Sequence, residues 1–354
     1  MSEKFERNDA PSKKKIFYPI IPPLKEYLIK YDREIELPVQ YSDMLRFNMS
    51  TPLLDKNDID TLWETVYYDE TEMQELYPGL KYIYALMHAS GRTEVMDHLS
   101  VSRIDYCCFG NSKPFRVRII NRLNDNYDHF YVKRADASRV YGLELEHILS
   151  PNRINYITSD DTLIEQHIPG LPGDIFVNDY INDVKFNQTR IAKEFVKFNE
   201  RCFVRLLGDM RAYNFVFDIT PDFDDFQFRI RAIDFDQQFF EGSLKIYLPQ
   251  YFKENFPYVD MALTHFNKDV MMQYQQEERA LIARRIKEER YRLTDLRDVL
   301  VKDEISTKEK IKQLGSELAD HYEDPVFSRC SSMGELIDRS LKRVLITTHV
   351  KSAL

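Results

Sequence analysis

Residues 206–217 read LLGDMRAYNFVF, and residues 232–236 read AIDFD. Local patterns predict a helix before the first stretch and a hairpin joining the two: helix Ile191–Phe203, strand Asn214–Asp218, turn Thr220-Pro221-Asp222 and strand Phe226–Phe235. Because the strands of a hairpin lie side by side, we expect Asn214 to lie near Asp234. The loop between the helix and the first strand would present Asp209 at the same place.

These three side chains suit the chemistry of a magnesium–nucleotide complex. Magnesium prefers oxygen ligands, and one or two side chains usually hold it together with phosphates and water. A carboxylate at Asp234 and an amide oxygen at Asn214 meet that need. Transfer of a phosphoryl group also requires a group that orients the acceptor hydroxyl and takes its proton, which Asp209 can do.

The pattern over residues 101–166 predicts an antiparallel sheet with one helix. Short runs rich in β-branched and aromatic residues alternate with turn signals such as Gly110–Pro114 and Asn124–Asn126. The elements expected are strands Val101–Cys108, Phe115–Asn121 and His129–Lys133, helix Ala137–Leu149, and strands Ile154–Ile157 and Thr162–Gln166.

The two ends of the chain have different patterns. Residues 1–15 are polar and charged, which predicts a disordered tail. Residues 16–100 are expected to be mainly helical, with Asp58-Ile59-Asp60 as an N-cap region ahead of Leu62, Trp63 and Val66, and a further helix from Tyr82 to His88 and beyond. From about residue 255 the pattern is again helical, and Gln275–Arg297 is expected to form a solvated amphipathic helix.

Composition excludes several classes of function. The formal net charge of −9 disfavours a general grip on a nucleic-acid backbone. No stretch is apolar enough to span a membrane, and the four cysteines lack zinc-site spacing. Buried, reduced thiols and a cytoplasmic location are therefore expected. The eight histidines show no HExxH or HxH spacing.

Asp209, four residues, Asn214, a hairpin and then Ile233-Asp234-Phe235 together resemble the catalytic loop and metal-binding segment of the protein-kinase-like superfamily. Gly208-Asp209 and the acid at Asp236 are most similar to its aminoglycoside/choline kinase branch. The resemblance implies that Asp209 is the catalytic base, that Asn214 and Asp234 bind magnesium, and that Asp236 assists them. It also implies a two-lobed α+β fold: an N-lobe over 101–168 with an antiparallel sheet and one helix, and a mostly helical C-lobe over 169–354. Residues 16–100 would be a helical extension.

The same resemblance assigns the nucleotide contacts. Phe130-Tyr131-Val132-Lys133 is similar to the kinase strand whose lysine binds the ATP phosphates and pairs with a helix glutamate. Glu144 is the preferred partner, because it shares a helical face with Val140 and Ile148, and Glu146 is the alternative. The stretch 163–173 is similar to the hinge between the lobes, so the residues expected to line the adenine pocket are Glu165, Gln166, His167 and Ile168.

The sequence departs from the family pattern in two places. No GxGxxG lies between the first two predicted strands of the N-lobe, and Leu207 stands where histidine is common. The leading expectation is an ATP- and magnesium-dependent kinase acting on a hydroxyl of a small molecule or protein. The alternatives are a pseudokinase scaffold, a nucleotidyl transferase of the same fold, and a metal-dependent hydrolase. The last would use a set of five acids, namely Asp222, Asp224, Asp225, Asp234 and Asp236.

Overall fold

The computed structural model describes residues 15–55, 57–89, 91–181, 183, 185–223 and 225–349. The predicted tail over 1–15 lies outside them except for Lys15. The chain forms two compact units. The first, here called the sheet unit, contains the described residues up to Ala137 together with Ile154–His167. The second, the helical unit, contains Ser138–Arg153 and the described residues from Ile168 onward.

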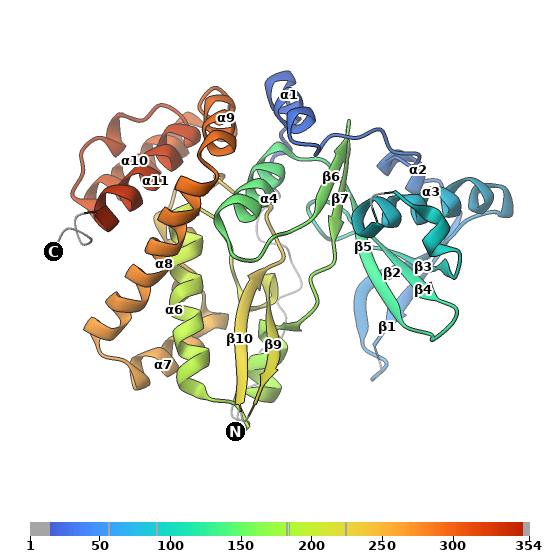
Figure 1. The fold of residues 1–354 in the computed structure, drawn as a ribbon, viewed down its shortest axis with the longest axis horizontal. Coiled ribbons are helices and arrows are strands. Elements are labelled where there is room, and N and C mark those ends of the chain that lie inside the picture. The colour runs from blue at the N-terminus through green and yellow to red at the C-terminus, as the bar shows by residue number, and fades with distance from the viewer. Residues whose placement is uncertain are drawn as a thin grey trace. The chain divides into compact units, whose positions relative to one another are not determined.

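The sheet unit is built around a seven-stranded antiparallel sheet (Figure 1). Its strand order is β1-β2-β3-β4-β5-β7-β6. The strands are β1 Met49–Leu54, β2 Asp60–Tyr67, β3 Leu99–Tyr106, β4 Phe115–Asn121, β5 Tyr127–Arg134, β6 Tyr156–Ser159 and β7 Thr162–Gln166. Five strands lie where they were predicted between residues 101 and 166, and the first three form the predicted meander, but β3 begins and ends two residues earlier than predicted and β6 two residues later.

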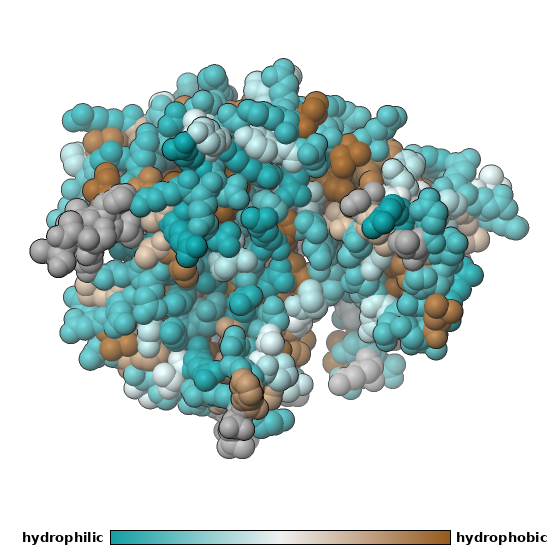
Figure 2. Space-filling view, viewed as in Figure 1, coloured by the Kyte–Doolittle hydropathy of each residue, from teal (hydrophilic) through white to brown (hydrophobic). Residues whose placement is uncertain are grey.

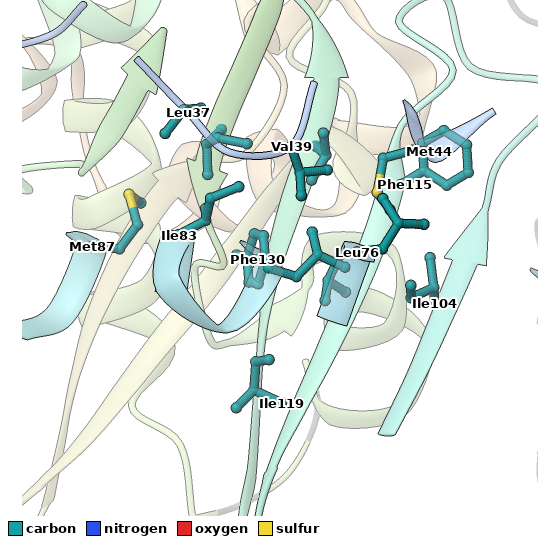
Figure 3. Close-up of a cluster of buried hydrophobic side chains, with 14 of the residues drawn as sticks. Leu37, Val39, Met44, Leu76, Ile83, Met87, Ile104, Phe115, Ile119 and Phe130 are labelled. Atoms are coloured by element: carbon teal, nitrogen blue, oxygen red, sulfur yellow. The ribbon is translucent and has the colours of Figure 1, made fainter. Parts of the chain in front are cut away.

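One face of this sheet carries the apolar core of the unit. Alternate residues of the central strands point to the same side, and helix α3 (Glu70–Ala89) packs its buried residues against them. Figure 3 shows this cluster, with Phe115 and Phe130 from the sheet close to Leu76 and Ile83 from the helix. The short helices α1 (Pro22–Lys30) and α2 (Tyr41–Met44) and the 3₁₀ turn η1 (Thr93–Met96) complete the unit.

The prediction of a helix around residues 58–66 was wrong. This segment forms β2, which pairs with β1 in a hairpin and extends the sheet. Threonine, valine and aromatic residues dominate it, and their preference for a strand outweighs a chance helical spacing. The segment before β2 forms a turn instead of a helix cap. Asp55 Oδ1 accepts hydrogen bonds from the backbone N–H groups of Asn57 and Ile59. The predicted helix from Tyr82 to His88 lies within α3.

Lys15 and the residues after it are fixed to the end of the sheet. Lys15 Nζ lies 2.8 Å from Asp136 Oδ1, and the backbone N–H of Tyr18 donates to the other oxygen of that carboxylate. The backbone N–H of Ala137 donates to Tyr18 O. Lys15, which was predicted to belong to the disordered tail, is therefore held in place.

The helical unit surrounds a small three-stranded sheet with helices (Figure 1). Its strands are β8 Leu171–Pro172, β9 Phe215–Asp222 and β10 Asp225–Ala232. Its α-helices are α4 Ala137–Leu149, α5 Gly173–Ile175, α6 Gln188–Arg205, α7 Phe256–His265, α8 Lys268–Glu288, α9 Arg290–Leu300, α10 Lys308–Tyr322 and α11 Met333–His349. Short turns of 3₁₀ or π type link them: η2 Phe176–Tyr180, η3 Ala212–Asn214, η4 Leu244–Tyr247, η5 Pro249–Tyr251, η6 Lys253–Asn255 and η7 Phe327–Arg329.

The mixed α+β class and the helical pattern after residue 255 are confirmed, but the predicted helix Gln275–Arg297 is wrong: the stretch is divided at Glu289 between α8 and α9. Helix α4 has the predicted bounds, although from Ser138 it belongs to the helical unit. The β9–β10 hairpin is also confirmed, but its turn is not at Thr220-Pro221-Asp222: Pro221 lies opposite Phe226 within the ladder. Pro221 lies beyond the two residues of β8, at a position that tolerates a residue without an N–H group.

The face of the molecule shown in Figure 2 is mostly hydrophilic, with apolar residues scattered over it. None of the helices in the described part of the chain is long and apolar enough to cross a membrane. The four cysteines are free thiols, but the expected burial holds only for Cys202, since Cys108 is exposed and the other two are partly exposed.

Candidate functional site

The loop after α6 turns sharply before it presents Asp209. Leu206 and Asp209 both adopt left-handed backbone conformations, with φ of 54° and 57°. Gly208 lies between them because the chain passes close to its neighbours there: a Cβ atom at this position would lie 2.7 Å from Ile246 Cγ2 and 3.0 Å from Gln237 O. The backbone N–H of Asp209 donates to Ile246 O at 3.1 Å, which fixes the loop.

Asn214 joins this loop to the hairpin. Its side-chain Nδ2 donates to Asp209 O at 2.7 Å, and its backbone carbonyl accepts from Ile233 N at 3.0 Å. Asn214 is therefore next to the residue that precedes Asp234, as the hairpin predicted. Asp234 itself follows the end of β10 instead of lying within a strand.

Asp209 is a largely buried carboxylate with an altered acidity. Burial raises its pKa to about 6, and the negative charges of Asp234 and Glu254 act in the same direction. Arg211 opposes the rise, because its Nε donates to Asp209 Oδ1 at 2.9 Å. A pKa near neutrality is what a general base requires.

Arg211 also binds a second acid that the sequence did not single out. Its Nη1 donates to Glu254 Oε1 at 2.9 Å, and the guanidinium lies over the ring of Phe252. Within the described chain, Glu254 Oε2 is buried without a hydrogen-bond partner. Because Glu254 is 43 residues from Arg211, no local spacing could have identified it.

A buried arginine holds the two acids after the hairpin. Arg139 Nη2 lies 2.6 Å from Asp234 Oδ1, and its Nε lies 2.7 Å from Asp236 Oδ1. The backbone N–H of Asp236 donates to the same Asp234 oxygen at 3.1 Å. The side chain of Asp234 remains one-third exposed, whereas that of Asp236 is 9% exposed. Asp236, expected to assist metal binding, is thus engaged in an ion pair.

Helix α4 carries Arg139 and is fixed closely to the chain after Asp234. Ser138 Oγ donates to Gln238 O at 2.5 Å. A Cβ atom on Gly142 would lie 3.1 Å from Phe235 Cβ and 3.2 Å from Gln238 Cβ, so this glycine lets the helix approach. These contacts leave Arg139 little freedom to move away from the two acids.

The two glutamates considered as partners of Lys133 are both buried on α4. Arg292 Nε donates to Glu144 Oε1 at 2.6 Å, and Arg205 forms an ion pair with Glu146. Neither glutamate is therefore a solvated surface charge. Both belong to the helical unit, whereas Lys133 belongs to the sheet unit.

Within the sheet unit, Lys133 pairs with Glu165. The Nζ atom lies 2.6 Å from Glu165 Oε2, and both side chains are 7% exposed. Lys133 is therefore a buried charge and not a solvated residue at a strand end. Glu165 was expected to line the adenine pocket, and it reaches Lys133 because β5 and β7 are adjacent.

The remaining residues of the expected adenine pocket lie at and after the end of β7. His167 Nδ1 is 3.2 Å from the hydroxyl of Tyr131, and burial lowers the pKa of His167. The backbone N–H of Gln166 donates to Asn155 O, and Ile168 is buried. His167 is thus a neutral ring at neutral pH, and it lies on the sheet face that carries Glu165.

The donor chemistry fits one magnesium ion at Asp234 and Asn214. Asp234 supplies a carboxylate, and Asn214 uses its amide nitrogen on Asp209 O, so its amide oxygen remains an acceptor. The described residues contain no cluster of three or more His, Cys, Asp or Glu side chains suited to a metal, and Asp224 of the hydrolase alternative lies outside them.

Comparisons with protein-family models and with curated proteins find no match for this chain.

Proposed function

We propose that this protein is an ATP- and magnesium-dependent phosphotransferase that acts on a hydroxyl group of a small molecule or a protein. It would use a two-lobed protein-kinase-like fold, with the lobes predicted over 101–168 and 169–354. One observation supports the proposal: the side chain of Asn214 donates to Asp209 O, and the backbone carbonyl of Asn214 accepts from the N–H of Ile233, the residue before Asp234.

In this proposal, Asp209 takes the proton of the acceptor hydroxyl. Its raised pKa of about 6 leaves it mostly ionised at neutral pH, yet more basic than an exposed aspartate. Arg211 holds Oδ1 of this carboxylate and so sets its orientation. Asp234 and Asn214 would hold magnesium, which neutralises charge on the phosphates when bound. Lys133, buried beside Glu165, would bind the nucleotide phosphates.

A second candidate is a nucleotide-binding or protein-interaction scaffold that does not catalyse transfer. The ion pairs favour it: Arg139 binds Asp234 and Asp236, Arg211 binds Asp209, and Glu165 binds Lys133. Each charge expected to serve catalysis thus has a partner within the protein. The absence of a GxGxxG sequence in 101–168 supports the same view.

One experiment separates the two functions. Purified protein is incubated with magnesium and ATP labelled on the γ-phosphate, once alone and once with cell extract. A phosphotransferase should place label on a metabolite or a protein, and Asp209→Asn should abolish the labelling while nucleotide binding stays near that of the wild type. If the wild type and Asp209→Asn both bind nucleotide but neither transfers label to an acceptor, the scaffold is supported. If neither protein binds nucleotide, the proposed site is wrong.

A further inference from the structure

An apolar cavity of about 240 Å³, half-open to solvent, lies in the helical unit, among helices α4, α8, α9 and α11. Figure 1 shows α8, α9 and α11 together at the C-terminal end of the chain. Leucine and isoleucine side chains from all four helices form its walls: Leu145, Ile286, Leu293, Leu296, Leu341 and Leu345. None of the residues proposed for phosphoryl transfer lines it, so it is independent of the proposed function.

The cavity has room for a small apolar ligand. Protein interiors are close-packed, and an apolar void of roughly 150 Å³ is already enough to bind a benzene molecule. Gly334 fixes α11 against the end of α9, since a Cβ atom there would lie 2.2 Å from Leu300 O. The two helices meet backbone to backbone at this point. They therefore cannot close the cavity by approaching each other further there.

The lining of the cavity contains more cationic than acidic side chains. The cations are Arg290, Arg297 and Lys342, and the acid among them is Asp338. Asp338 pairs with Lys342 at 2.6 Å and lies 4.0 Å from Arg297. Arg297 also contacts Asp298, while Arg290 rests over the ring of Tyr291 and donates to its hydroxyl. The net charge of the lining favours an anionic group at the opening.

We propose that this cavity binds a single-chain anionic amphiphile, with the alkyl chain among the leucines and the anionic head at Arg290 and Lys342. The apolar walls provide no hydrogen-bonding group for a polar ligand body. Arg290 and Lys342 are exposed lining residues on two different helices, α9 and α11, and the proposal places the head group between them. A medium-length chain matches a volume of this size.

The test measures binding of straight-chain carboxylates by titration calorimetry, from hexanoate to dodecanoate, each kept below its aggregation concentration. Each added methylene should strengthen binding by roughly fourfold until the cavity is filled, after which affinity should level off. Decylammonium, with the same chain as undecanoate but a positive head, should bind at least tenfold more weakly. Absence of binding, no dependence on chain length, or equal binding of both heads would overturn the proposal.

Variants locate the site. Thr294 is exposed on the lining, so Thr294→Trp should block the opening and reduce decanoate binding by tenfold or more without disturbing the core. Ile346→Trp, an exposed position on α11 outside the lining, is the matched control and should bind normally. Lys342→Met should weaken the binding of decanoate more than the binding of decylammonium. Equal binding by Thr294→Trp and wild type would place the amphiphile elsewhere, and the chain-length series remains decisive if a variant fails to fold.

Discussion

Arg139 Nη2 lies 2.6 Å from Asp234 Oδ1, so a buried guanidinium holds the carboxylate proposed as the main metal ligand. The same side chain holds Asp236. A metal ion and an arginine stabilise a carboxylate by the same electrostatic attraction, so Arg139 would compete with magnesium for the negative charge of Asp234 and Asp236. The ion pairs of Arg139 with Asp234 and Asp236 are therefore the feature of the proposed site that most directly opposes magnesium binding.

Replacement of Arg139 by methionine should destabilise the protein and make it more responsive to magnesium. Loss of one partner from a buried ion pair typically costs about 3–5 kcal/mol, because the remaining charge is left uncompensated. A divalent cation could then compensate Asp234 and Asp236. We expect the unfolding temperature of Arg139→Met to rise more with added magnesium chloride than that of the wild type.

Arg205→Met is the matched control for this variant. Arg205 is also buried and pairs with an acid on α4, Glu146, but neither residue belongs to the proposed site. This variant should lose a similar amount of stability and should gain nothing from magnesium beyond the wild-type response. An equal magnesium response in the two variants would show that Asp234 and Asp236 do not bind the ion.

The rate of phosphoryl transfer should depend on the ionisation of Asp209. Because only the ionised carboxylate can accept a proton, kcat/KM should fall as the pH drops through about 6. Arg211 lowers the pKa of Asp209, so Arg211→Met should move this decline to higher pH. A pH–rate profile of both proteins measures the shift. A decline at the same pH in both would exclude Asp209 as the group that titrates.

Asp209 should also reduce stability at neutral pH. Its pKa in the folded protein, about 6, lies above its ordinary value of 3.8, so the folded state disfavours the charged form. This cost is present above pH 6 and is relieved as the pH falls toward 3.8. Asp209→Asn should therefore be more stable than the wild type at pH 8, by up to about 3 kcal/mol, and the gain should shrink toward pH 4.

Urea unfolding at several pH values measures this difference, and Asp324 is a control of opposite sign. A hydrogen bond from Arg339 holds the pKa of Asp324 below its usual value. Asp324→Asn should therefore destabilise the protein at pH 8, and the loss should diminish as the pH falls. If Asp209→Asn is also destabilising at pH 8, the carboxylate at 209 contributes to folding instead of being held for function.

Local sequence signals predicted the elements that position the site, because those elements are specified locally. The bounds of β4 and α4 follow from turn residues and from the spacing of apolar residues, and both signals lie in or next to the element itself. The same reasoning failed at β2, where strand formation depends on pairing with β1 and β3. It also missed Arg139, whose acids lie 95 and 97 residues away, because ion pairs between distant segments leave no local pattern.

The pair of Lys133 and Glu165 allows a structural role to be separated from a role in nucleotide binding. Lys133→Met alone should be destabilising by about 3–5 kcal/mol, since it leaves Glu165 buried without this partner. The double variant Lys133→Met/Glu165→Gln removes both charges, so most of that stability should return. If Lys133 binds the nucleotide phosphates, the double variant should be stable but should still bind ATP at least tenfold more weakly than Glu165→Gln alone. Chemical denaturation and nucleotide titration of the three variants test this. Normal ATP binding by the double variant would show that Lys133 serves only to neutralise Glu165.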